Sequence, residues 1–160
     1  MVSKAKRRTT NSGYTRYDSE NPPTTQQAIK MMRNHDPQTM EDGFHTLLPK
    51  VDEVLDDLIA ALDDPINSII ADVLVELIGD SKRPQALPVL IENLYSENRG
   101  RREWAMLGLL HWNTKESRQA LRDARHFEFP SPVMTAEFQE LIERAIGPEQ
   151  TWEKRNKRYR

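Results

Sequence analysis

The 160-residue sequence contains no cysteine. Disulfide bonds and thiolate metal ligands are therefore excluded, and the composition fits a reducing compartment, so we expect a cytoplasmic protein. No stretch approaches the roughly 18 consecutive apolar residues of a membrane-spanning helix. No apolar segment follows the basic residues near the N-terminus either. We therefore expect neither a membrane protein nor one exported through a signal peptide.

Patterns that carry chemistry are also scarce. The four histidines include no i, i+4 pair, and no glycine-rich phosphate-binding loop occurs. The carboxylates of Asp52, Glu53, Asp56 and Asp57 fall on the polar side of a predicted helix, where solvent would keep them ionised, whereas a general acid needs a raised pKa. We therefore expect no enzymatic activity, metal ion or cofactor. The alternative interpretation of these carboxylates is an acidic surface for a basic partner.

Charge is unevenly distributed along the chain. Residues 1–20 contain five Lys or Arg and two Asp or Glu, a net charge of +3, and residues 149–160 carry the same net charge. Because the whole chain carries −2, the residues between these ends carry −8. Residues 1–23 have almost no aliphatic side chains and finish in Pro-Pro, which predicts a disordered basic tail, and we expect a second basic tail over 148–160.

The basic tails support a second functional hypothesis, a nucleic-acid-associated protein. Clustered Lys and Arg gain affinity for phosphates through counterion release. The acidic central region would repel phosphate, so we expect this attraction to be weak and non-specific.

The region between the tails has the periodicity of helices. Thr24 with Gln27 matches a capping box, and Asp36-Pro37 supplies an N-cap carboxylate followed by the favoured first residue, which together predict a helical N-terminal cap over residues 24–46. Further along the chain, apolar residues recur at three- and four-residue steps, and no alternating strand pattern occurs. The sequence therefore predicts an all-α fold.

Six helices are predicted in the remaining region. The first runs from Pro49 to Asp63, and the second starts at Asp64-Pro65 and is expected to stop at Gly79. The third helix is predicted from Pro84 to Leu94 and the fourth from Arg101 to Trp112. Ala120-Leu121 marks the fifth helix, and the sixth has an apolar face that ends at Gly147-Pro148.

The chain also repeats itself. Gln85-Ala86-Leu87 recurs as Gln119-Ala120-Leu121 at a shift of 34 residues, and Leu58 and Leu62 fall on Leu90 and Leu94 at a shift of 32. Two helices per period of this length are typical of an antiparallel helical solenoid, whose units bury their apolar faces by stacking. We assign the repeats to residues 47–147.

The repeat contains an Asp63-Asp64-Pro65 turn, a Gly79-Asp80 pair and the triplet Ala86-Leu87-Pro88. In this order and spacing these marks resemble the HEAT-like repeats of the phycobilisome-lyase type. The resemblance implies a short HEAT-like α-solenoid of antiparallel helix pairs, in a small stand-alone bacterial form. Stand-alone HEAT-like proteins of similar size include immunity factors of toxin systems. What the resemblance implies is a non-enzymatic protein-binding module, an immunity or adaptor protein that occludes the surface of a partner such as a toxin.

The repeat type leaves a third hypothesis open, an accessory lyase or chaperone-like factor for a tetrapyrrole protein. No residue of the sequence supports it specifically.

In HEAT-like stacks the second helix of each pair usually lines the concave surface. The predicted partner-binding residues lie on two such helices and align with one another in the repeat: Ser68, Asp72 and Glu76, and Arg102, Met106 and Leu110. A row of acidic residues beside an arginine and apolar side chains is typical of a surface that binds another protein. The apolar side chains provide buried contacts with the partner, and the charges orient it as it approaches. The alternative is that Met106 and Leu110 pack against the following helix pair.

Overall fold

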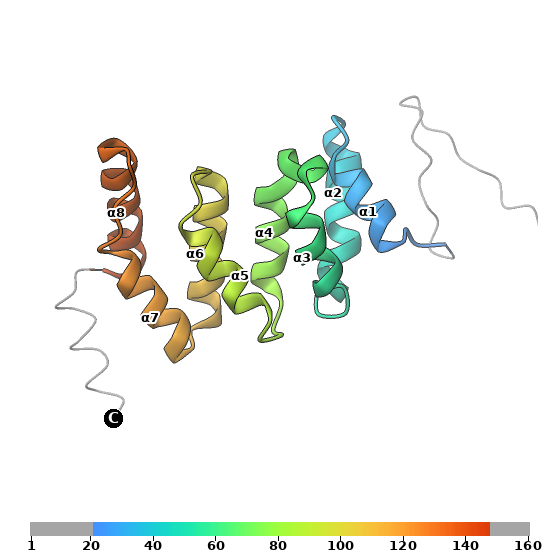
Figure 1. The fold of residues 1–160 in the computed structure, drawn as a ribbon. Coiled ribbons are helices and arrows are strands. Elements are labelled where there is room, and N and C mark those ends of the chain that lie inside the picture. Colours follow the sequence, from blue (N-terminus) through green and yellow to red (C-terminus); the bar gives the residue numbers. More distant parts are fainter. Residues whose placement is uncertain (1–20, 148–160) are drawn as a thin grey trace, which may run out of the picture. The chain divides into compact units, whose positions relative to one another are not determined.

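The computed structural model describes residues 21–147 (Figure 1). The predicted tail over 1–23 therefore lies outside the described residues apart from its last three positions, and the predicted tail over 148–160 lies wholly outside them. The described residues form helices and no β-strand, which confirms the all-α prediction. No helix in this part of the chain has the length and apolar character needed to cross a bilayer. The chain divides into two compact units with a boundary between Lys50 and Val51.

In the first unit, residues 21–50 form three helical segments: α1 (Thr25–Met32), α2 (Pro37–Leu47) and the 3-10 turn η1 (Leu48–Lys50). The predicted capping box is confirmed, since the Thr24 hydroxyl accepts the Gln27 N–H at 3.2 Å and the Gln27 side chain accepts the Thr24 N–H at 2.9 Å. Asp36 caps α2 by accepting the Thr39 N–H at 2.9 Å and its hydroxyl at 2.6 Å. These hydrogen bonds lower the pKa of Asp36.

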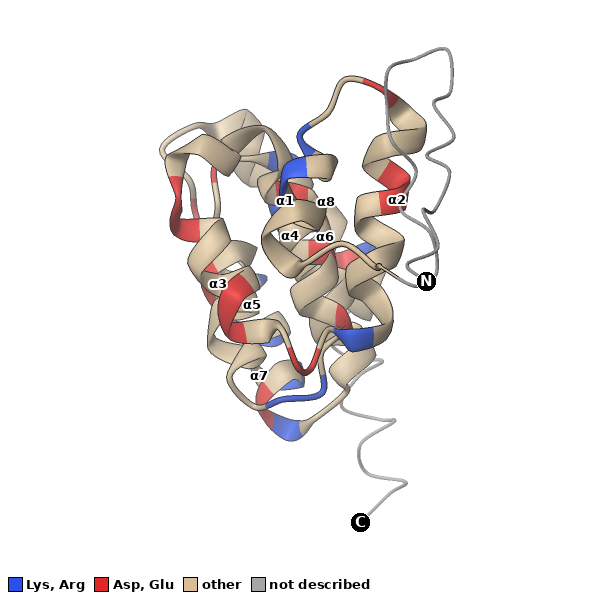
Figure 2. Ribbon diagram, turned by 90° about the vertical axis from the view of Figure 1, so that its right-hand side faces the viewer, with Lys and Arg blue, Asp and Glu red and all other residues tan. Residues whose placement is uncertain are grey.

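The described part of the second unit, residues 51–147, has seven helical segments: α3 (Leu55–Asp63), the 3-10 helix η2 (Pro65–Ile70), α4 (Ala71–Asp80), α5 (Ala86–Leu94), α6 (Arg99–Trp112), α7 (Lys115–Ala124) and α8 (Pro132–Ile146). Seen along the row of helices, α4, α6 and α8 lie in one layer and α3, α5 and α7 in another (Figure 2). Helix α4 packs against α3, α5 and α6, and α6 packs against α5, α7 and α8. Each inner helix is therefore covered on more than one side, as the nearly all-round apolar character of α4 requires.

The first predicted helix of this unit begins later than its periodicity suggests. Residues 51–54 form a turn, and α3 starts at Leu55. In that turn the Asp52 carboxylate accepts the Ser81 hydroxyl at 2.8 Å and the Lys82 N–H at 2.7 Å. These bonds, the one from Lys82 first, lower the pKa of Asp52. The prediction that Asp52 lies on the polar side of a helix is therefore wrong: it ties the start of α3 to the end of α4.

The second predicted helix is divided. Asp64 accepts the Ile66 N–H at 3.0 Å, as predicted for a cap, but the first six residues are a 3-10 helix and the backbone bends at Ile70 before α4. Asn67, which is buried in η2, donates from its side chain to the Ala61 carbonyl at 2.9 Å. This bond holds the tight segment against the end of α3. On the same segment, Ile66 is 63% exposed and Ile69 is 67% exposed.

Gly79 has a different role from the helix stop that its position suggests. It lies inside the last turn of α4, which ends one residue later. A Cβ built on Gly108 of α6 would come 3.0 Å from the Gly79 Cα and 3.1 Å from both methyl groups of Leu90. Most Cβ contacts are longer than this, so a side chain at either glycine would push its neighbours apart, and the paired glycines favour the close crossing of α4 and α6.

Aromatic rings fill the space between the loop before α6 and the loop before α8. Ring centroids lie 4.6 Å apart for Tyr95 and Phe127, 4.9 Å for Phe127 and Phe129, and 5.3 Å for Phe129 and Phe138. Tilted and edge-on contacts of this kind are favourable beyond their burial. The aromatic cluster links the last two helix pairs.

Candidate functional site

The structure separates the three predicted binding residues on the α4 side. Ser68 is exposed but lies on η2, before the bend at Ile70, whereas Asp72 and Glu76 are half-buried on α4. A Cβ built on Gly100 would come 3.0 Å from the Asp72 carboxylate. Asp72 therefore lies at the N-terminal turn of α6, where the helix dipole favours a negative charge.

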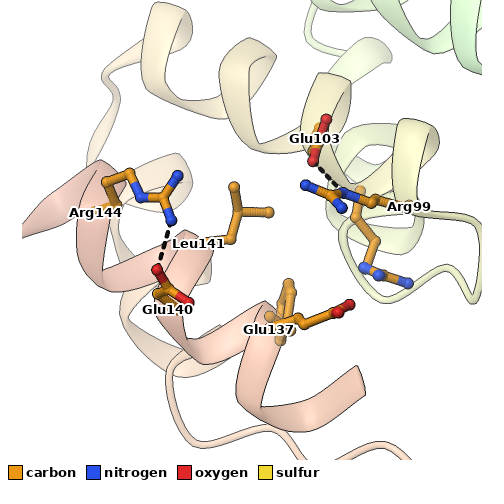
Figure 3. A pocket seen from close by; sticks show the side chains of 8 residues that line it. Arg99, Glu103, Glu137, Glu140, Leu141 and Arg144 are labelled. Atoms are coloured by element: carbon orange, nitrogen blue, oxygen red, sulfur yellow. Dashed lines mark hydrogen bonds and ion pairs between the residues drawn. The ribbon is translucent and has the colours of Figure 1, made fainter. Parts of the chain in front are cut away.

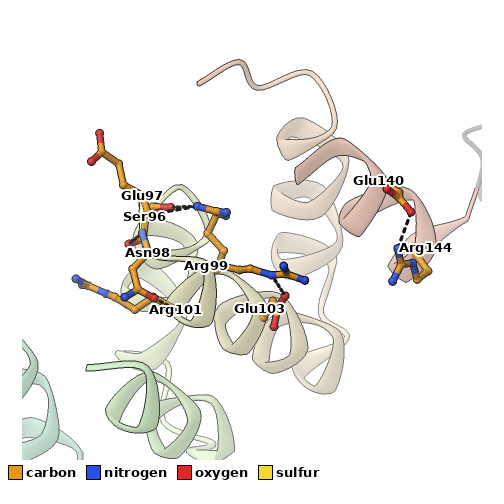
Figure 4. A network of polar contacts seen from close by, with 9 residues as sticks. Ser96, Glu97, Asn98, Arg99, Arg101, Glu103, Glu140 and Arg144 are labelled. Carbon is orange, nitrogen blue, oxygen red and sulfur yellow. Dashed lines mark hydrogen bonds and ion pairs between the residues drawn. The ribbon is translucent and has the colours of Figure 1, made fainter. Parts of the chain in front are cut away.

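On α6 the predicted residues are not an exposed row. Arg102 is 3% exposed and Met106 is 6% exposed, while Leu110 is half-buried. The expectation that Arg102 presents its charge at the surface is wrong. Its Nη1 donates to the Ser96 carbonyl at 2.8 Å and the Glu97 carbonyl at 2.9 Å, in the loop shown in Figure 4.

Arg102 also joins the aromatic cluster. Its guanidinium carbon lies 5.1 Å from the centre of the Phe129 ring, which is within the range of a cation–π contact. Burial lowers the pKa of Arg102, but an arginine retains its charge at neutral pH. The buried Arg102 side chain thus holds the loop before α6 through hydrogen bonds to its carbonyls, and it is not accessible to a partner.

The outer face of α6 includes four residues at four-residue steps: Arg99, Glu103, Leu107 and His111. Leu107 is 46% exposed. Arg99 donates from Nε to Glu103 at 2.7 Å, a contact that raises the pKa of Arg99. This i, i+4 pair was the sequence signal that could have identified the outer face of α6, because such pairs stabilise solvent-facing helix surfaces.

A groove lies between α4 and α6 where the paired glycines bring the helices together. Its volume is about 240 Å³, and its lining residues are Glu76, Gly79, Asp80, Trp104, Leu107, Gly108 and His111. We call it the α4–α6 groove. The apolar pattern of residues 101–112 predicts that Trp104 lies in the core together with Leu74 and Leu90, but Trp104 is only half-buried and lines this groove. Of the predicted binding residues, Glu76 is the one that lines it.

Negative charge dominates the α4–α6 groove. The pKa of Glu76 is raised, first by burial and then by the like charges of Asp80 and Asp72. These three carboxylates follow one another at four-residue steps along α4. Neither lysine nor arginine is among the residues that line the groove. A ligand of opposite charge would relieve this repulsion.

A second cavity, the α6–α8 cleft, has a balanced charge. Its volume is about 250 Å³, and Figure 3 shows its lining, which includes Arg99 and Glu103 on α6 and Glu140 and Arg144 on α8. Arg99 pairs with Glu103 and Arg144 pairs with Glu140, each at 2.7 Å (Figures 3 and 4). Leu141 lies between the two pairs (Figure 3). Since these charges are neutralised within their own helices, the cleft has less to offer a charged ligand.

Neither cavity has the ligands of a metal centre. Within residues 21–147, no group of three or more His, Asp or Glu side chains is placed to hold an ion. Comparison with protein-family models, curated proteins and solved structures finds no match. The features of the described residues that bear on function are therefore the geometry and charge of the α4–α6 groove.

Replacing Glu76 by glutamine should raise the free energy of unfolding at about pH 7 by roughly 0.4–1 kcal/mol, because it removes two like-charge i, i+4 pairs. Because the pKa of Glu76 is higher in the folded state than in the unfolded state, its ionised carboxylate lowers the stability of the fold at pH values above the folded-state pKa. Below the unfolded-state pKa the carboxyl is protonated in both states, and this destabilisation disappears. The gain should therefore vanish at about pH 3.5. Urea unfolding at both pH values tests this.

The control for this prediction is Glu92→Gln, at an exposed position on α5. We expect it to leave stability nearly unchanged at both pH values. A Glu76→Gln protein that is less stable than the wild type would show that the carboxylate makes a favourable contact in the groove.

Proposed function

We propose that residues 47–147 are a short HEAT-like solenoid and that the protein is a non-enzymatic protein-binding module. In this proposal it is an immunity or adaptor protein that covers a surface of its partner. The stacking of α4, α6 and α8 in one layer, with α5 and α7 in contact in the other, supports the repeat interpretation.

The observation that carries the proposal is the exposed apolar surface in the α4–α6 groove. Leu107, 46% exposed, lies beside the half-buried Trp104, and the carboxylates of Glu76 and Asp80 border them. Apolar and aromatic side chains surrounded by charged residues are typical of protein interfaces. The apolar and aromatic side chains provide most of the binding energy, and the charged residues set the rate of association and the orientation of the partner. The close crossing at Gly79 and Gly108 holds both walls on rigid helices.

Replacing Leu107 by aspartate should reduce capture of the native partner at least about tenfold, because a central apolar contact is lost and a charge is placed in the interface. The measurement is quantitative affinity capture from the native host, with identification by mass spectrometry and a binding titration of the captured protein. The matched control is Val133→Asp, an equally drastic change at a 69% exposed position at the start of α8.

Equal capture by the wild type and Leu107→Asp would exclude this surface. The nucleic-acid hypothesis makes a different prediction for the same assay: substitution of the basic residues in 154–160, which lie outside the described residues, should abolish binding, and affinity should fall steeply with salt.

A further inference from the structure

Within the residues that the structure describes, the carboxylates lining the α4–α6 groove form no ion pair, and His111 is the one other titratable side chain in the lining. By comparison, Asp56 pairs with Arg83 at 3.3 Å, and two of the carboxylates of the α6–α8 cleft, Glu103 and Glu140, pair with arginines on their own helices. No described Lys or Arg forms an ion pair with Glu76 or Asp80. Glu76 is moreover half-buried, so water compensates its charge less well than it does at the surface.

The groove also has an aromatic wall. Trp104 lies in the lining together with both carboxylates, and indole is the aromatic side chain that attracts cations most strongly. A planar guanidinium can stack on such a ring while its N–H groups donate to a carboxylate, which an ammonium group cannot do in the same way. The combination favours arginine over lysine.

The size of the groove fits one side chain. Its volume of about 240 Å³ is below the range of roughly 300–1,000 Å³ that is usual for pockets enclosing whole small molecules. The exposed part of Leu107 borders the same groove and offers an apolar contact for a residue next to the inserted one.

We propose that the α4–α6 groove receives an arginine side chain from a basic segment of the partner protein. The guanidinium stacks on Trp104 and donates to Glu76 and Asp80, and the neighbouring partner residue packs on Leu107. This inference rests on the proposed protein-binding function and names the chemistry of the partner. It also explains why an acidic residue that lowers stability is placed in the groove, since the same repulsion strengthens the attraction for a cation.

The test uses the full-length protein and a short peptide, acetyl-Gly-Arg-Gly-amide, with its uncharged citrulline analogue as the comparison. The indole N–H resonance of Trp104 is followed by NMR during titration. We expect a saturable shift with a Kd on the order of millimolar for the arginine peptide, and at least about tenfold weaker binding of the citrulline peptide, because only the cation gains the charge-assisted bonds.

Two variants locate the interaction. Glu76→Gln should weaken binding of the arginine peptide about three- to tenfold, although the same change is expected to stabilise the fold. Glu92→Gln on α5 should bind like the wild type. Because neither change removes a packed side chain, loss of folding does not confuse the result, and the citrulline comparison needs no variant at all.

Equal binding of the two peptides, or no shift of the Trp104 resonance with either, would overturn the inference. Failure of the proposed function is a separate result: if Leu107→Asp leaves partner capture intact, the protein-binding proposal for this surface fails whatever the peptides do. If capture depends on Leu107 while arginine is not preferred, only the arginine inference fails.

Discussion

Replacing Leu90 by alanine should lower the free energy of unfolding by about 2–5 kcal/mol, one of the two largest effects expected in this protein. Leu90 is completely buried on α5, and both of its methyl groups lie against the crossing of α4 and α6. Removing them takes apolar surface out of contact and leaves a cavity at that crossing.

The cavity should persist because the helices around it cannot move closer. A Cβ on Gly79 would already be 3.2 Å from the Gly108 Cα, so the backbones of α4 and α6 are in contact at this point. The cost of a truncation rises with the volume that stays empty, which favours the upper half of the range.

Chemical unfolding monitored by circular dichroism measures the effect. Leu87→Ala on the same helix is the control, since that side chain is half-buried and its loss should cost less than half as much. A loss below about 1 kcal/mol for Leu90→Ala would mean that the packing around this crossing relaxes and that the helix register is different.

The features that the sequence predicted well are local ones. The caps formed by Thr24, Asp36 and Asp64 join residues two or three positions apart, so the residue types at fixed spacing are sufficient to identify them. Asp52 could not be placed in this way, because its partner Ser81 lies 29 residues further along the chain. Only the packed arrangement of α3 and α4 brings these two residues together.

The candidate site was predicted in part, since Glu76 lines the groove but the face of α6 was assigned incorrectly. Apolar character suggested that Trp104 belongs to the core, and charge suggested that Arg102 belongs to the surface. Hydrophobicity alone cannot separate a core residue from an exposed interface residue. Nor does it show that a buried charge has partners, which in this case come from the Ser96-Glu97 loop and from Phe129.

Replacing Arg102 by methionine should lower the free energy of unfolding by about 2–4 kcal/mol. Methionine keeps much of the length and the apolar stem of the side chain, so the change mainly removes the charge and its bonds. The carbonyls of Ser96 and Glu97 lose their donor, and Phe129 loses the cation above its ring. The loop before α6 and the aromatic cluster should loosen together, because one side chain joins them.

The result separates two roles for Arg102. A structural role predicts this loss of stability, and Arg102→Lys should recover part of it because an ammonium group can still donate to one of the carbonyls. Arg99→Met is the control: Arg99 is exposed and its pair with Glu103 is a surface ion pair, so its loss should cost at most about 1 kcal/mol. A partner-contact role would instead leave the stability of Arg102→Met unchanged while weakening partner capture. With the side chain 3% exposed and held by two loop carbonyls, the loss of stability is the expected outcome.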